Sequence, residues 1–255
     1  LSIEGLTDCE GNQNGQETID ILVGEQPEPG DLAISELMAD PTPSVGYPEA
    51  EYFELFNKSD KTIELRGCEI SGVLFEESVF LTPGQYVAFS SDENIDMFTG
   101  VSGIRFLDMS TSFLTNSGRE LVLINADEVE LDFVEYSDDW YNNPEKEDGG
   151  FSLELINPFL PCSGEFNWTA STDLLGGTPA VQNSVFNDFP DQTAPEVQSV
   201  VIDQGNVVTL RFSEPLDEAS INDIVATFNP DLDVAAVFPI RPDVISIELI
   251  PSLEI

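Results

Sequence analysis

The chain has 255 residues, 41% of them hydrophobic, and its 49 Asp and Glu residues against 8 Lys and Arg residues give a formal net charge of -41. Nucleic acids and anionic membranes are poor partners for such a surface, because binding to phosphate groups relies on Lys and Arg. The sequence contains no histidine, which excludes Ser-His-Asp and Cys-His catalytic arrangements and His-ligated metal sites.

The chain is long for one domain, whose usual size is about 100–150 residues, so we expect two units. Apolar residues are plentiful enough for folding despite the charge. We expect no direct membrane insertion and no signal peptide, because no apolar run reaches roughly 18 residues and no basic start precedes an apolar stretch. We expect the sequence to begin and end within a longer protein.

The acidic composition has two interpretations. Uncompensated charge is tolerable where the medium supplies screening ions or divalent cations, which predicts an extracellular or cell-surface location. The charge either keeps the protein soluble or provides specific calcium sites, since carboxylates and carbonyls are the ligands that calcium takes. Calcium is the one cofactor that we consider.

Short runs in which apolar and polar residues alternate recur along the chain from residue 32 onward. They are rich in branched and aromatic side chains, as half-buried strands are, and turn residues such as Thr82-Pro83-Gly84 separate them. Many short strands with regular turns predict an all-β fold, either a β-sandwich or a barrel. The runs in the first part of the chain are 32–37, 52–56, 85–89, 120–124 and 129–136.

Two junctions divide the chain. Residues 24–30 form a predicted linker, because prolines cannot donate to a central strand, and residues 188–195 form a second one. A short helical turn is expected at 217–224. After the second linker, further strands are expected at 197–202, 207–212, 224–228, 234–238 and 244–249.

An ordered set of segments fills the region between the junctions: LAISELM (32–38), EYFELFNKSD (51–60), IELRGCEI (63–70), LTPGQYVAF (81–89), LTNSGRELVL (114–123), FSLELINP (151–158), NWT (167–169) and GTP (177–179). Together these segments resemble the lamin-tail domain, an Ig-like β-sandwich found in nuclear lamins and in many bacterial secreted proteins. The resemblance implies a lamin-tail-like sandwich at 31–187.

The flanks resemble bacterial Ig-like domains of the SbsA type, which alternate with lamin-tail domains in secreted proteins of Bacteroidetes. The segments GLTDCEGN (5–12), TAPEV (193–197) and LRFSEPLD (210–217) carry this resemblance. It implies the C-terminal hairpin of a preceding Ig-like domain at 1–23 and the N-terminal part of a following, partial Ig-like β-sandwich at 196–255. A tandem array with a period of about this length is a further hypothesis.

Cys68 stands where the lamin-tail pattern usually has an aromatic residue, and Cys162 precedes the NWT segment. The resemblance therefore suggests a disulfide between Cys68 and Cys162, with Cys9 pairing outside this sequence; the alternative is three buried thiols. The wide spacing of the cysteines argues against zinc and dithiol redox sites.

Glu36 and Glu54 lie in the two most lamin-tail-like segments. They either bind a cation or a partner, or satisfy backbone and side-chain donors at the edge of the sandwich. Paired carboxylates could act as acid and base, but with so many of them proximity is expected by chance. We therefore predict no catalytic residues and no enzymatic activity.

An acidic loop follows the run at 129–136. It is either a solvated loop or a calcium site without EF-hand spacing, and the predicted calcium ligands are Asp138, Asp139, Glu145, Glu147 and Asp148. Trp140 and Tyr141 in the same loop are either exposed aromatic residues that contact carbohydrate or protein, or a cap over the end of the sandwich.

Two functions from different classes follow. The first is a non-catalytic structural or adhesion module of a large secreted or cell-surface bacterial protein, whose partners are neighbouring Ig-like or lamin-tail domains and other copies of itself. The second is an accessory module of a secreted enzyme that binds carbohydrate or a surface protein through Trp140 and Tyr141. A nuclear lamin function is less consistent with the cysteines and with the absence of coiled-coil heptads.

Overall fold

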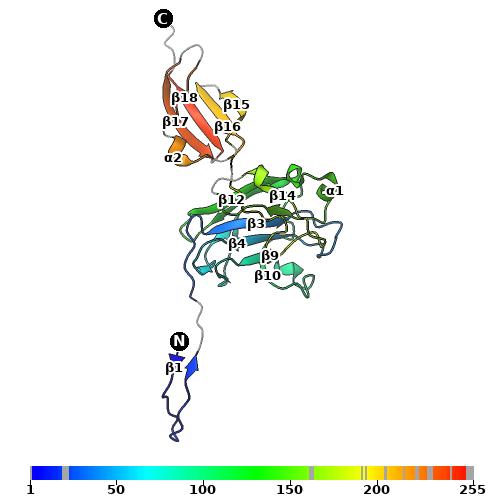
Figure 1. Ribbon diagram of the computed structural model, residues 1–255, viewed down its shortest axis with the longest axis vertical. Coiled ribbons are helices and arrows are strands. Elements are labelled where there is room, and N and C mark those ends of the chain that lie inside the picture. The colour runs from blue at the N-terminus through cyan, green and yellow to red at the C-terminus, as the bar shows by residue number, and fades with distance from the viewer. Residues whose placement is uncertain are drawn as a thin grey trace.

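The computed structural model describes residues 2–18, 23–160, 164–190, 192, 194–203, 206–214, 216–221, 224–228, 232–241 and 243–250. Strands dominate these residues, and the α-helices among them are the short α1 (Pro144–Glu147) and α2 (Glu218–Ile221). The strands form a short hairpin, a two-sheet sandwich and a separate four-stranded sheet in chain order (Figure 1). The predicted all-β sandwich fold is confirmed.

The first layer of the sandwich is a six-stranded sheet with the order β10-β9-β4-β3-β13-β14. Its neighbouring strands are antiparallel, except that β10 runs parallel to β9. A β-bulge interrupts β3 between Ile34 and Glu36. The strands are β3 (Leu32–Met38), β4 (Tyr52–Asn57), β9 (Tyr86–Ser91), β10 (Ile104–Leu107), β13 (Leu153–Leu155) and β14 (Trp168–Ala170).

The second layer is a four-stranded antiparallel sheet with the order β12-β11-β6-β7. It consists of β12 (Glu130–Ser137), β11 (Gly118–Ile124), β6 (Glu69–Ile70) and β7 (Val73–Leu74). A small additional sheet pairs β5 (Ile63–Glu64) with β8 (Phe80–Leu81).

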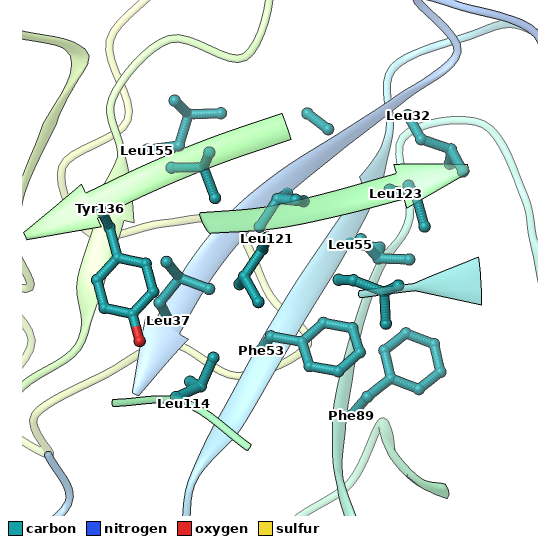
Figure 2. Close-up of a cluster of buried hydrophobic side chains, with 14 of the residues drawn as sticks. Leu32, Leu37, Phe53, Leu55, Phe89, Leu114, Leu121, Leu123, Tyr136 and Leu155 are labelled. Carbon is teal, nitrogen blue, oxygen red and sulfur yellow. The ribbon is translucent and has the colours of Figure 1, made fainter. Parts of the chain in front are cut away.

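The main hydrophobic core lies between the two layers. Leu121 and Leu123 of β11 form one cluster with Leu37, Phe53 and Leu55 of β3 and β4 (Figure 2). All five side chains are fully buried. The period-two alternation in these runs is the cause, because successive side chains of a strand point to opposite faces and the apolar set faces the other layer.

The two central strands are buried on both faces, contrary to the expectation of half-buried strands. Every residue of β3 and β4 is buried. A second hydrophobic cluster, which includes Met38, Tyr52, Ala88, Phe98 and Ile104, covers part of the outer face. The remainder of that face carries buried polar side chains, which form the candidate site.

The flanking units are smaller. The hairpin pairs β1 (Ser2–Ile3) with β2 (Glu17–Thr18). The C-terminal sheet has the order β15-β16-β18-β17, with β15 (Val197–Asp203), β16 (Val207–Phe212), β17 (Val234–Arg241) and β18 (Val244–Leu249).

The predicted strand at 224–228 is wrong, although α2 confirms the expected helical turn nearby. The sheet consists of β15, β16, β18 and β17, and residues 224–228 form no strand in it. Val225 is 88% exposed. Alternation by itself cannot separate a strand from an extended connection.

In the described part of the chain, we find no helix with the length and apolar character needed to cross a membrane.

Candidate functional site

Three glutamates lie side by side on the outer face of the six-stranded sheet. Glu36 of β3 pairs in register with Glu54 of β4 and with Glu154 of β13. All three are 0% exposed. Directly opposite residues on neighbouring antiparallel strands have Cβ atoms about 5 Å apart, so the three carboxyl groups form one group, which we call the glutamate cluster.

One stretch of chain covers this cluster. Residues 178–185, here called the covering segment, follow β14 and donate a backbone amide to each of the three carboxyl groups. The Thr178 amide lies 2.7 Å from Glu36 Oε1, the Ala180 amide 2.6 Å from Glu54 Oε2, and the Val185 amide 3.1 Å from Glu154 Oε2. The cluster therefore supplies acceptors to a segment without regular strand pairing.

Hydroxyl groups of the covering segment add further bonds. Ser184 Oγ donates to Glu154 Oε2 over 2.8 Å. Thr178 Oγ1 lies 3.0 Å from Glu154 Oε1 and 3.3 Å from Glu36 Oε2, and so stands between two of the carboxyl groups. These contacts join β3 and β13 through one side chain.

The sheet itself provides the remaining donors. Tyr52 OH and Ser152 Oγ donate to Glu36 Oε1 over 2.7 and 2.6 Å. Ser35 Oγ, at the bulge of β3, donates to Glu54 Oε1 over 2.7 Å. Buried polar groups need such partners, since an unpaired one costs about 1–3 kcal/mol, and the two hydrogen-bond sets meet this need.

Asn183 and Gly177 allow the covering segment to pack closely on the sheet. The Asn183 side-chain amide donates to the carbonyls of Ser35 and Leu155, each over 2.8 Å. At Gly177, an added Cβ would lie 2.2 Å from the Tyr52 hydroxyl and 2.8 Å from Glu36 Oε1. Glycine is therefore required where the chain enters the segment.

Burial sets the electrostatics of the cluster. It raises the pKa of Glu36 to about 7, and the adjacent Glu154 contributes in the same direction. Burial also raises the pKa of Glu54 well above its ordinary value, with Glu36 as the second cause. The donors to these groups act in the opposite direction, because they stabilise the charged form.

The geometry decides between the two interpretations of Glu36 and Glu54. Both satisfy backbone and side-chain donors and neither reaches solvent. Their predicted position at a sandwich edge is wrong, because β3 and β4 are inner strands of the sheet. Sequence reasoning missed Glu154, although it alternates with Leu153 and Leu155 in a segment of the same pattern.

The structure does not bring the five predicted calcium ligands together. Asp138 and Asp139 begin the 3-10 helix η2 (Asp138–Tyr141), whereas Glu145 and Glu147 lie on α1 and Asp148 ends it. Within the described ranges, no group of three or more Asp, Glu, Cys or His residues could hold a metal ion. Calcium binding by this loop stays a prediction that the geometry does not favour.

The expectation of an exposed aromatic pair is wrong for Tyr141. Its side chain is 2% exposed and packs in the main core, and burial raises its pKa. Trp140 is partly buried against that core, with its ring centroid 6.2 Å from that of Trp168. Both residues therefore pack on the main core, as the alternative of a cap requires, and do not form an exposed aromatic pair.

The cysteines differ in environment. Cys9 is an exposed free thiol and Cys68 a fully buried one. Cys162 lies outside the described residues, so its disulfide with Cys68 stays a prediction. Cys68 packs in the main core among apolar neighbours.

These environments predict unequal reactivity. Burial raises the pKa of the Cys68 thiol to about 11, and the thiolate is the reactive form. In the native, reduced protein, iodoacetamide should modify Cys9 at least about tenfold faster than Cys68, as followed by peptide mapping in a mass spectrometer. Urea should abolish the difference. Equal native rates would contradict the burial of Cys68, and a linked peptide pair without reductant would confirm the disulfide.

Comparison with known protein families agrees with this architecture. Residues 25–138 match the family model of the Lamin Tail Domain. The match covers less than half of the chain, and it ends before β13 and β14, although these strands belong to the same sheet as β3 and β4. No curated protein matches the chain. The family match and the two-layer sandwich together support a lamin tail domain at the centre of this chain.

Proposed function

We propose that this chain is a non-catalytic structural and adhesion module of a large, secreted or cell-surface, multi-domain bacterial protein. The observation that carries the proposal is that the glutamate cluster holds one part of the chain to another. The buried carboxyl groups, which are the chemically most unusual groups in the sandwich, hold the chain to itself and have no exposed surface. Such a group stabilises the sandwich and cannot contact a substrate.

Further features support this proposal. A sandwich that matches the Lamin Tail Domain lies between a hairpin and a second sheet along the chain, which supports neighbouring domains and other copies of the chain as the partners that we propose. The net charge of -41 suits an extracellular medium rich in screening ions. The alternative accessory module loses one of its two proposed contact residues, because Tyr141 is buried.

The connections of the sandwich suggest how it would carry load. The chain joins the sandwich at Glu25, inside the predicted first linker, through a parallel bridge to Ile63 of β5. It then enters β3, which is hydrogen-bonded on both sides, to β4 and β13. It leaves after the covering segment, which is bonded to the same three strands. A force applied at the two ends of the sandwich would therefore act on the bridge at Glu25 and on β3 at one end, and on the bonds of Asn187 and Phe189 and the covering segment at the other.

Single-molecule stretching of the full chain tests this proposal. Unfolding of the residues between the two linkers should occur in one resolved event and release about 500 Å of contour length, at roughly 3.4 Å per residue. A sandwich that extends gradually, without a resolved event, would not serve as a load-bearing module and would defeat the proposal. The matched control is Leu174→Ala, which changes an exposed side chain and should leave the event unchanged.

A further inference from the structure

The glutamate cluster concentrates three ionisable groups beneath one segment of chain. From this geometry we propose that the cluster is a pH-sensitive latch, which holds the covering segment on the sheet at mildly acidic pH and releases it as the pH rises. The inference goes beyond the proposed function, and a load-bearing module could exist without it.

The cluster is closed off from solvent. Glu36, Glu54 and Glu154 are all fully buried and lie on adjacent strands. Like charges at this separation repel more strongly in a protein interior than in water. Each proton lost from the cluster therefore adds a negative charge. The repulsion between these charges is screened little, because the groups are buried and lie on adjacent strands.

The cluster also has no compensating cation. Among the described residues, no salt bridge joins Lys or Arg to the cluster. Lys146, on α1, donates instead to the Ser171 carbonyl. The charge can therefore be relieved by protons or by opening of the covering segment to water.

The other titratable groups around the cluster are neutral or acidic. Tyr52 of β4 donates to Glu36, and Tyr86 of β9 has its pKa raised to about 12 by burial and by Glu54. Tyr47 has its pKa raised by burial, then by Asp173 and Glu36. None of these groups can neutralise a carboxylate, so the elements that pack around the cluster reinforce its sensitivity.

The raised pKa values set the direction of the effect. The pKa of Glu36 rises from 4.5 to about 7 in the closed state, and that of Glu54 is raised as well. A raised pKa means that the closed state binds protons more tightly than an open one. Closure is therefore fully favoured below about pH 4.5 and loses this advantage as the pH rises through about 7.

Release of the covering segment would leave the chain beyond it attached to the sandwich. Beyond the covering segment, the Asn187 amide donates to the Ile156 carbonyl, and the Asn157 side chain donates to the Phe189 carbonyl. These bonds hold the chain just before the second linker. With the covering segment detached, they are what remains to fix that end of the sandwich.

Hydrogen exchange of the full chain, followed by NMR and corrected for the intrinsic effect of pH, tests the latch. The amides of Thr178, Ala180 and Val185 report on the covering segment, and those of Leu55 and Phe89 report on the core. Protection of the first group should fall at least about tenfold between pH 5 and 8, since one pKa unit corresponds to a tenfold change. The core amides, which exchange through global unfolding, should remain better protected than the three reporter amides at both pH values, so that the fall reports local release of the covering segment.

Variants identify the groups responsible. Glu36→Gln and Glu54→Gln each keep an accepting oxygen and remove one ionisable group, so each should weaken the pH dependence. Glu76→Gln removes the same charge at an exposed position and should behave as the unmodified chain. Thr178→Val, which removes the hydroxyl between Glu36 and Glu154, should lower protection at pH 5.

Two results would overturn the latch. One is equal protection of the three reporter amides at pH 5 and 8 in the unmodified chain, which requires no variant to fold. The other is an undiminished pH dependence in whichever glutamine variants are folded. Force-induced unfolding in one event can still be observed in either case, so failure of the latch is distinguishable from failure of the proposed function.

Discussion

Replacement of Phe53 with alanine is expected to lower the free energy of unfolding by about 3–5 kcal/mol, because it leaves a cavity between the two layers. The Phe53 ring is fully buried, stacks on Phe89 with centroids 5.3 Å apart, and lies 5.8 Å from Phe113. Because a typical domain has only about 5–15 kcal/mol of stability, this loss would be a large fraction of the stability of the sandwich.

Urea unfolding followed by tryptophan fluorescence measures this loss. The two tryptophans of the chain, Trp140 and Trp168, both lie in the sandwich, so the signal reports on this domain. Leu174→Ala provides the control, since Leu174 is 91% exposed and a surface change of this kind costs less than about 0.5 kcal/mol. A loss below about 1 kcal/mol for Phe53→Ala would show that this ring does not hold the layers together.

The strands of the sandwich could be predicted because each one carries its own local signal. The alternating runs at 32–37, 52–56 and 129–136 correspond to β3, β4 and β12, and turns such as Thr82-Pro83-Gly84 separate neighbouring strands. Period-two patterning fixes which side chains face the core. The same reasoning predicted a strand at 224–228, where the structure has an extended connection without strand pairing.

The burial of the outer face could not be predicted from these patterns. Glu36 and Glu54 have the alternation of solvent-facing residues in a half-exposed sheet. What buries them is the covering segment, which lies more than a hundred residues away in sequence and has no strand pattern of its own. A tertiary contact of this kind leaves no local signal beyond the nearby Ser, Thr and Tyr donors.

The acidic loop shows a related limit of sequence patterns. Composition indicated carboxylates and aromatic residues close together in sequence, but the backbone decides whether their side chains converge. In η2 the Tyr141 ring enters the core while Asp138 stays at the surface layer, where its carboxylate accepts the Asp139 amide. Local capping of short helices explains these acidic residues without a metal.

The free energy of unfolding is expected to rise by several kcal/mol between pH 8 and pH 5, even in about 1 M salt, where the Debye length is about 3 Å and repulsion between exposed carboxylates is screened. Burial raises the pKa of Glu51 to about 7 and that of Asp132 to about 6. Glu51 accepts the Leu114 amide, and Asp132 accepts the Ile34 amide at the bulge of β3. The carboxyl groups of Glu51 and Asp132 therefore change protonation within the folded protein in this pH range.

The sign follows from these raised pKa values. Because the folded pKa values lie above the ordinary 4.5 of Glu and 3.8 of Asp, the folded state binds protons more tightly than the unfolded state. The stabilisation is complete below the ordinary values and is lost as the pH rises, through about 6 for Asp132 and about 7 for Glu51. A difference of one pKa unit between the folded and unfolded states corresponds to about 1.4 kcal/mol.

Urea titrations at several pH values should assign the effect. Asp132→Asn and Glu51→Gln keep an oxygen that accepts the same backbone amide, so each should flatten the profile within its own range of pH. Glu76→Gln removes an equal charge from the surface and should leave the slope unchanged. A flat profile in high salt would show that the buried carboxyl groups are ionised at little cost. If both internal variants kept the slope of the unmodified chain, the pH response would have to arise outside Glu51 and Asp132, in the glutamate cluster or in the surface charge.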